Sequence, residues 1–262
     1  MKIATYNVWN DNKGMGMRFQ QLLKEIQSVD ADIIGLQEVT PFFYEKILLQ
    51  QSGYPYMKFH QYSNEQEGLA VLSRFPFDGS FFLQTLPEYS CSTALCVTFQ
   101  VAGKHYSCTN LHLPWDSACK KEQQIAEIDR FIHELYQKGK SDVSILLGDF
   151  NGSLNSSVHR FLLGEQTLNG REAKPYWFEL SSTFAEIHNL PLRPTLDFVR
   201  NPRWKGQNST EIPYPADRIY VMYGSGNDCL RSVNIFGTEV SKENGLAASD
   251  HYGVAAEIDF CR

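Results

Sequence analysis

Residues 145–151, with the sequence Ile-Leu-Leu-Gly-Asp-Phe-Asn, join an apolar run directly to a carboxylate and a carboxamide. Such an uninterrupted run, followed at once by polar residues, indicates a buried β-strand that ends near Asp149. In α/β proteins, functional residues concentrate at strand ends and in the loops beyond them. The stretch therefore predicts an α/β fold with a polar site at this end of the strand.

Five further polar motifs have a similar placement along the chain. Ile33-Ile34 precedes Glu38, for example, and Ile219-Tyr220-Val221 follows Asp217. Carboxylates, carboxamides and imidazoles that are delivered together can hold a hard cation and move protons beside it. This set of residues indicates metal-assisted hydrolysis of phosphate esters. The five motifs are Thr5-Tyr6-Asn7, Leu36-Gln37-Glu38-Val39, Asn110-Leu111-His112-Leu113, Ala216-Asp217-Arg218-Ile219 and Ser249-Asp250-His251.

Each motif taken alone also has a structural explanation. Glu38 can cap a helix, Gly148-Asp149 can form an ordinary turn, and Asp217-Arg218 can be a surface ion pair. Single histidines such as His112 and His251 are more often hydrogen-bonded structural residues than catalysts. The conjunction of the motifs and their order favour a site.

The order of the motifs resembles the endonuclease/exonuclease/phosphatase superfamily, the deoxyribonuclease-I-like metal phosphoesterases, from Met1 to the last strand near Phe260. The resemblance implies a four-layer α/β/β/α sandwich, in which two packed mixed β-sheets are flanked by helices. Members cleave DNA, RNA, phospholipids, inositol phosphates or sugar phosphates. The resemblance therefore specifies the reaction more closely than the substrate.

Within the superfamily, the chain is similar in motif detail to 5′-tyrosyl-DNA phosphodiesterases. It departs from them at Pro114-Trp115, where they carry Glu-Ser, and at Leu196, where they carry Trp. Both departures lie where substrate selection is expected, so Trp115 is a candidate substrate-binding residue. The similar stretches are Leu36–Pro41 with Tyr44 following, Glu67-Gly68, Thr195–Asp197 and Ile235–Gly237.

The resemblance implies a cofactor, Mg²⁺ or Mn²⁺, and the residues that hold it. Glu38 is the implied principal ligand, with Asn7 close by and Asp250 contributing directly or through water. One carboxylate or two suffice, because Mg²⁺ keeps several of its waters. His112 is an implied catalytic imidazole, and Glu67 is its implied partner behind the site.

The resemblance also implies the remaining catalytic residues. Asp149 and Asn151 leave one tight turn two residues apart, and in the family this pair aligns the attacking water and supports the pentacovalent state. His251 is expected to donate to a phosphate oxygen. The carboxylate expected to hold its ring is that of Asp217.

Net charge bears on the substrate. The chain carries 24 basic and 30 acidic residues, a formal charge of −6, which argues against indiscriminate binding of duplex DNA. We expect a phosphorylated small molecule or a nucleic-acid end instead. The irregular segment Leu190–Pro215 is a candidate specificity loop. Its Arg203 and Trp204 are either part of a solvated loop or a lip that meets a phosphate and stacks on a ring.

Length and composition lead to further expectations. We expect one domain over residues 1–262, and a hydrophobic fraction of 42% supports an extensive core. No run approaches 18 apolar residues and no secretory signal is evident at the N-terminus, so we expect a cytoplasmic protein without a membrane span. The cysteines are expected to be reduced. No feature indicates a protein partner, and we expect a monomer.

The substrate class stays open between two kinds of enzyme. The first is a phosphodiesterase that acts on a nucleic-acid end or on a similar aryl or alkyl phosphodiester. The alternative is a phosphomonoesterase for sugar or inositol phosphates, or a sphingomyelinase-like lipid-headgroup phosphodiesterase. A non-catalytic binding module is a remote alternative, since it would be expected to lose acidic ligands or the final histidine, and all are present here.

Hydrophobic spacing predicts alternating strands and helices. Phe19, Leu22, Leu23 and Ile26 recur at helical intervals, after a first strand that ends near Trp9. The further predicted helices are 41–51 and 117–137, and the further predicted strands are 32–36, 68–73, 93–101, 105–111, 143–147, 219–222, 232–236 and 251–258.

Overall fold

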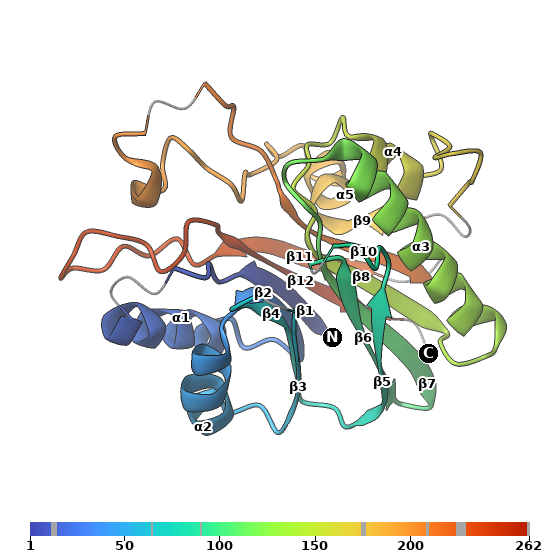
Figure 1. Cartoon of the computed structure of the whole chain (residues 1–262), viewed down its shortest axis with the longest axis horizontal. Helices are drawn as coiled ribbons and strands as arrows, with labels where there is room; N and C mark the ends of the chain where they lie inside the picture. Colours follow the sequence, from blue (N-terminus) through green and yellow to red (C-terminus); the bar gives the residue numbers. More distant parts are fainter. Residues whose placement is uncertain are drawn as a thin grey trace.

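Two six-stranded mixed β-sheets pack face to face, and helices cover their outer sides (Figure 1). The computed structural model describes residues 1–11, 15–63, 65–89, 91–173, 177–207, 210–223 and 229–260. In Figure 1, α1 and α2 lie outside one sheet, and α3 and α4 lie outside the other. The four-layer α/β/β/α sandwich predicted from the sequence is therefore confirmed.

The first sheet takes strands from both ends of the chain. α1 (Met15–Val29) packs on its outer face. A π-helix at Phe43–Leu48, followed by the short α2 (Leu49–Gln51), lies beside α1. In spatial order the strands are β11 (Cys229–Phe236), β12 (Gly253–Asp259), β1 (Lys2–Asn7), β2 (Ile33–Val39), β4 (Gly68–Ser73) and β3 (Tyr56–Gln61).

The second sheet comes from the middle of the chain. Its outer face is covered by α3 (Ala118–Gln137) and α4 (Ser157–Leu162). The helix α5 (Leu180–Ile187) packs beside β10 and β11, and so contacts both sheets. In spatial order the strands are β5 (Phe77–Gln84), β6 (Thr93–Val101), β7 (Lys104–His112), β8 (Val143–Asp149), β10 (Asp217–Tyr223) and β9 (Phe178–Glu179).

The apolar run at 145–147 is explained by burial on both faces of β8. Ile145 and Leu147 point into the core between the sheets, whereas Leu146 packs under the helices on the outer side. Successive side chains of a strand point to opposite faces, so a strand covered on both sides must be apolar throughout. The same alternation places Ile3 and Ala4 of β1 in different cores.

Polar contacts fix the distance between the two sheets close to the site. Asn110 of β7 donates through Nδ2 to the carbonyls of Leu36 and Ala70, both at 2.9 Å, and accepts from Gln37 Nε2 at 2.6 Å. Gly35 makes this approach possible, because a Cβ there would collide with Leu147 and with Asn110 itself. The two sheets therefore meet in one defined position at the end that carries the polar motifs.

Sequence reasoning missed two partly exposed edge strands and the short helices α4 and α5. β3 and β5 lie at sheet edges and are partly exposed, so neither carries a continuous apolar run. The predicted helix at 41–51 is confirmed, and its central part is a π-helix. The predicted strand 251–258 begins two residues later, at Gly253, so His251 lies in the loop that precedes β12.

The cysteines among the described residues differ in exposure. Cys96 and Cys108 are buried on β6 and β7, and burial raises the pKa of Cys96 to about 12. Cys119 and Cys229 carry exposed free thiols, and Cys261 lies outside the described residues. No helix in the described ranges is both long and apolar enough to cross a membrane.

A buried histidine gives the fold a predicted acid sensitivity. His159 of α4 lies with Nδ1 2.7 Å from the Tyr220 hydroxyl, and burial together with the Arg218 charge lowers its pKa from 6.5 to about 4. Between these pH values the unfolded chain binds the extra proton and the folded chain does not. The stability that neutral His159 contributes is therefore fully present above pH 6.5 and is lost as the pH falls to about 4.

We expect the His159→Asn variant to show a flatter pH dependence of stability. Over this range the wild type should lose on the order of 3 kcal/mol of unfolding free energy that the variant does not lose. Urea unfolding of both proteins at the two ends of the range measures the difference. Parallel pH profiles for the two proteins would contradict the assignment.

Candidate active site

The predicted site residues gather at one end of the two sheets, around a cleft of about 710 Å³. Parallel pairing brings His112 opposite Asp149, and antiparallel pairing brings Asp217 opposite the same residue. β1 and β2 end beside them in the other sheet. The predicted residues that line the cleft are Glu38, Glu67, His112, Trp115, Asp149, Asn151, Trp204, Asp250 and His251.

Asn7 connects the carboxylates of the two sheets. Its Nδ2 donates to Glu38 Oε1 at 2.9 Å and to Asp149 Oδ2 at 3.0 Å, and its side chain is fully buried. Its amide oxygen accepts from the Trp9 backbone at 3.0 Å. In this orientation Asn7 presents donors to Glu38 and Asp149, and it fixes the distance between them.

Glu38 is held in an uncommon backbone conformation. Its φ is 57°, at an irregularity in the pairing of β2 with β4 between Leu36 and Val39. Positive φ is costly for a side chain of this kind and is concentrated at functional sites. Glu38 Oε2 accepts from the Asn10 backbone at 3.0 Å, and the Asn10 side chain donates to Glu67. Sequence reasoning missed Asn10, whose only signal was a polar residue three positions after Asn7.

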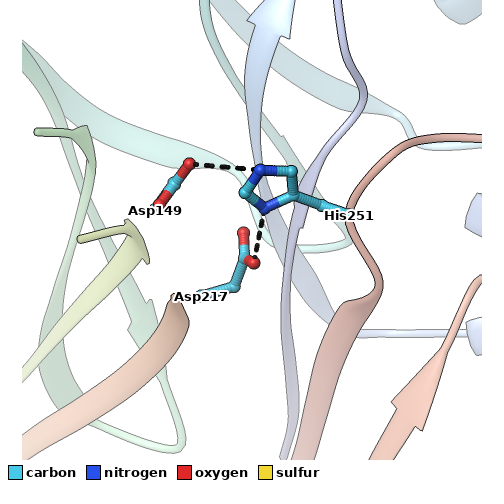
Figure 2. Close-up of side chains that lie close together, drawn as sticks. All are labelled: Asp149, Asp217 and His251. Carbon is cyan, nitrogen blue, oxygen red and sulfur yellow. Dashed lines mark hydrogen bonds and ion pairs between the residues drawn. The ribbon is translucent and has the colours of Figure 1, made fainter. Parts of the chain in front are cut away.

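His251 lies between two carboxylates that face different nitrogens of its ring (Figure 2). Asp217 Oδ2 is 2.9 Å from Nδ1, and Asp149 Oδ2 is 3.9 Å from Nε2. Burial alone would lower the pKa of His251, but the charges of Asp217 and Asp149 outweigh it and raise the pKa well above the usual value. The two carboxylates therefore favour the protonated form of the ring, and its Nε2 side borders the cleft.

A second set of contacts orients Asp217 and His251. Thr195 Oγ1 accepts from the backbone amides of Ala216 and Asp217, both at 2.9 Å. Ser249 Oγ donates to the Asn7 carbonyl at 2.7 Å and accepts from the His251 amide at 3.2 Å. The sequence similarity included Thr195 and Ser249, but sequence reasoning gave neither a role in positioning the site.

The turn after β8 carries Asp149 and Asn151. The Asn151 amide donates to Asp149 Oδ1 at 2.8 Å, and Asn151 has a φ of 45°. Its Nδ2 donates to the Leu113 carbonyl at 2.9 Å, and its own carbonyl accepts from Lys121 Nζ at 2.5 Å. One oxygen of Asp149 is thus occupied within the turn, and the other faces Asn7 and both imidazoles.

His112 shares the carboxylate Asp149 with His251 and also lies near Glu38. Its Nε2 is 3.6 Å from Asp149 Oδ2 and 3.9 Å from Glu38 Oε1. Glu67 was expected to lie behind His112, and the two residues line the same two pockets, the cleft and a smaller one beside it. The Glu67 carboxylate accepts a hydrogen bond from the Asn10 side chain. Burial and the Glu38 charge raise the pKa of Glu67, and the charge of His112 opposes them.

Two groups of side chains have the chemistry of metal ligands. Ligand atoms of Asp149, Asp217 and His251 lie within 4.8 Å of one another, but Asp217 is fully buried and hydrogen-bonded to His251. Glu38 and Asp250 both border the open cleft. Burial, with the Glu38 charge adding to it, raises the pKa of Asp250 to about 6. A hard cation that keeps waters fits the pair at the cleft, because it would offset this crowding of negative charge.

The candidate substrate-binding residues occupy different places. Trp204 borders the cleft and donates through Nε1 to the Asp250 carbonyl at 3.0 Å, with Phe198 against its ring. Trp115 lies at the rim and is 80% exposed. Arg203 is not among the cleft-lining residues, since its Nε donates to the Ala247 carbonyl at 2.8 Å and its guanidinium lies over the Trp9 ring.

The family follows from comparison with known proteins. The model of the Endonuclease/Exonuclease/phosphatase family matches residues 4–251. The chain belongs to this family, whose members are hydrolases of phosphate ester bonds. A curated relative, an uncharacterized protein from Caenorhabditis elegans, is 24% identical over 258 residues, which cover 86% of this chain and 79% of the relative.

Solved structures of several relatives share the fold. Truncated TDP2 from C. elegans superposes with a TM-score of 0.80 at 16% identity, covering 99% of this chain and 97% of that one. TDP2 from D. rerio, in complex with a single-strand DNA product, has a TM-score of 0.79 at 16% identity, with 99% of each chain covered. A mannosyl-6-phosphatase from Bacteroides thetaiotaomicron has a TM-score of 0.71 at 18% identity, covering 99% and 100%.

Proposed function

We propose that the chain is a Mg²⁺- or Mn²⁺-dependent phosphodiesterase that acts on a nucleic-acid end or on a similar aryl or alkyl phosphodiester. The observation that carries this proposal is the cleft, which joins a polar end bearing Asp149 and His251 to an aromatic wall with Trp204 and Tyr214. Such a cleft can hold a phosphorus atom and a ring attached to it. Similarity in motif detail to 5′-tyrosyl-DNA phosphodiesterases and in fold to TDP2 supports the same substrate class.

In this proposal the chain's own residues position the water and stabilise the developing charge. Asp149 Oδ2 is free of the turn and faces the cleft, so it aligns and deprotonates a water beside the phosphorus. Cationic His251 donates to a phosphoryl oxygen, and Asp217 keeps its ring in place. His112 supplies a second donor. A divalent cation held by Glu38 and Asp250 would polarise a phosphoryl oxygen.

The net charge of −6 favours recognition of an end or a small molecule over a long duplex. We expect the protein with Mn²⁺ to hydrolyse a nucleoside 5′-aryl phosphodiester faster than intact duplex DNA. A panel of aryl diesters, duplex DNA, sugar phosphates, nucleotide monoesters and sphingomyelin tests this. Faster release of inorganic phosphate from a monoester than cleavage of any diester would establish a phosphomonoesterase instead.

Trp204 provides the sharper test of the aromatic wall. We expect Trp204→Ala to reduce the preference for an aryl diester over the corresponding alkyl diester by roughly tenfold, the size of one stacking contact with the aryl ring. Trp204→Phe retains a ring but loses the hydrogen bond to the Asp250 carbonyl. A preference retained in the Phe variant and lost in the Ala variant assigns the effect to stacking. An unchanged preference in both would exclude it.

A further inference from the structure

A second pocket, of about 280 Å³, opens beside the catalytic cleft. It shares Glu67, His112 and Trp115 with the cleft, so a molecule bound at the catalytic residues can extend into it. We call it the Gln124 pocket. The residues that define it are Leu86, Tyr89, Leu113, Trp115, Lys120 and Gln124.

Gln124 of α3 is buried in this pocket without a hydrogen-bond partner. Its side chain has no exposure, and within the described part of the chain neither Oε1 nor Nε2 has a partner. A buried carboxamide that leaves its donor and its acceptor unused costs free energy, and native proteins rarely retain one. A ligand that draws the side chain out of its buried position and satisfies both atoms would explain the residue.

The chemistry of the pocket limits the kinds of ligand that it can bind. A carboxamide offers an acceptor and a donor side by side, which match the hydrogen-bonding edge of a heterocyclic base. Tyr89, Leu86 and Trp115 provide apolar and aromatic surface for its faces. A phenyl group esterified to phosphorus has no such edge.

Hydrogen bonds hold the Tyr89 wall of the Gln124 pocket in place. The Tyr89 carbonyl accepts from Ser92 Oγ at 2.7 Å and from Gln84 Nε2 at 3.1 Å, which ties down the loop between β5 and β6. Lys120 lies one helical turn before Gln124, and its Nζ is 3.6 Å from the centre of the Tyr89 ring. The helix thus presents the cation of Lys120 and the amide of Gln124 to the same pocket, whose lining also includes the carboxylates of Glu67 and Asp116.

We propose that the Gln124 pocket binds the base of a nucleotide whose phosphate lies at Asp149 and His251. The inference rests on the proposed phosphodiesterase function and specifies its substrate as nucleotidic. The base belongs either to a free nucleotide or to the terminal nucleotide of a strand, and the two share this recognition chemistry. Discrimination among bases is then a property of Gln124.

The test uses nucleoside 5′-p-nitrophenyl phosphates with each of the four bases, a 5′-aryl oligonucleotide, and base-free bis(p-nitrophenyl) phosphate. The wild type should prefer one base, and Gln124→Leu should reduce kcat/KM for that substrate relative to the base-free diester by roughly tenfold. Gln137→Leu, on the exposed end of the same helix, is the matched control and should behave like the wild type. Dependence on Gln124 with the mononucleotide assigns the pocket to a free nucleotide, and dependence with the oligonucleotide alone assigns it to a strand end.

Calorimetric titration with nucleoside 5′-monophosphates separates this inference from the proposed function. If the wild type hydrolysed no diester, the proposed function would fail, yet weaker binding of the monophosphate by Gln124→Leu would still support the pocket. Normal hydrolysis with the same base profile and the same binding in Gln124→Leu would overturn the inference alone. Thermal unfolding of each variant verifies that it is folded.

Discussion

The Asp149→Asn variant is expected to lower kcat for phosphodiester hydrolysis by roughly 10²-fold or more, with a much smaller change in KM. The carboxylate lies 3.0 Å from Asn7 Nδ2 and faces both imidazoles, so it is the proposed base that aligns the water. Asparagine has nearly the same shape but cannot accept the proton. Steady-state kinetics on an aryl diester measure the effect.

The control for Asp149 is Asp78→Asn, which removes one carboxylate from an exposed position on β5. It should retain wild-type kinetics. A large rise in KM with kcat intact in Asp149→Asn would reassign the residue to ground-state binding of the substrate. A cooperative unfolding transition in the variant shows that the loss is chemical rather than structural.

Glu38→Gln is expected to abolish turnover at ordinary Mg²⁺ or Mn²⁺ concentrations and to recover partly when the metal is in large excess. Glutamine keeps one of the two oxygens that accept from Asn7 and Asn10, and it supplies a neutral oxygen where a hard cation prefers a carboxylate. Activity titrated against Mn²⁺ measures the shift in apparent metal affinity. Glutamine also keeps the side-chain length at this position of positive φ.

Glu257→Gln, on the exposed side of β12, is the matched control for Glu38 and should titrate with metal like the wild type. Wild-type turnover that persists after exhaustive chelation would rule out the proposed cofactor. An unshifted metal titration in Glu38→Gln would place the cation elsewhere. The group formed by Asp149, Asp217 and His251 would then be the next candidate.

The sequence predicted the central strands because residues such as Ile145 and Leu146 are buried on opposite faces and must both be apolar. It could not predict β3 and β5, whose exposure depends on their position at sheet edges. That position is set by pairing between distant segments. The π-helix at Phe43–Leu48 depends likewise on packing against α1 rather than on local preference.

The site residues that the sequence identified lie together because strand pairing brings their ends to one edge. His112 and Asp149 are directly paired, for example. The supporting residues were harder to predict because their role exists only in three dimensions. Thr195 acts through backbone amides 21 and 22 residues away. Gln124 resembles any polar residue of an amphipathic helix until its burial is known.

The bridge that Asn7 makes between Glu38 and Asp149 links ligand binding at the site to the stability of the packing between the two sheets. Because the two carboxylates belong to different sheets, a ligand that engages both contributes its binding free energy to holding the sheets together. If the two sheets separated, the ligand would lose its contacts with one of them, even while each sheet kept its own hydrogen bonds. Protection of amides along the inner strands against hydrogen exchange should therefore rise when the site fills, well beyond the residues that touch the ligand.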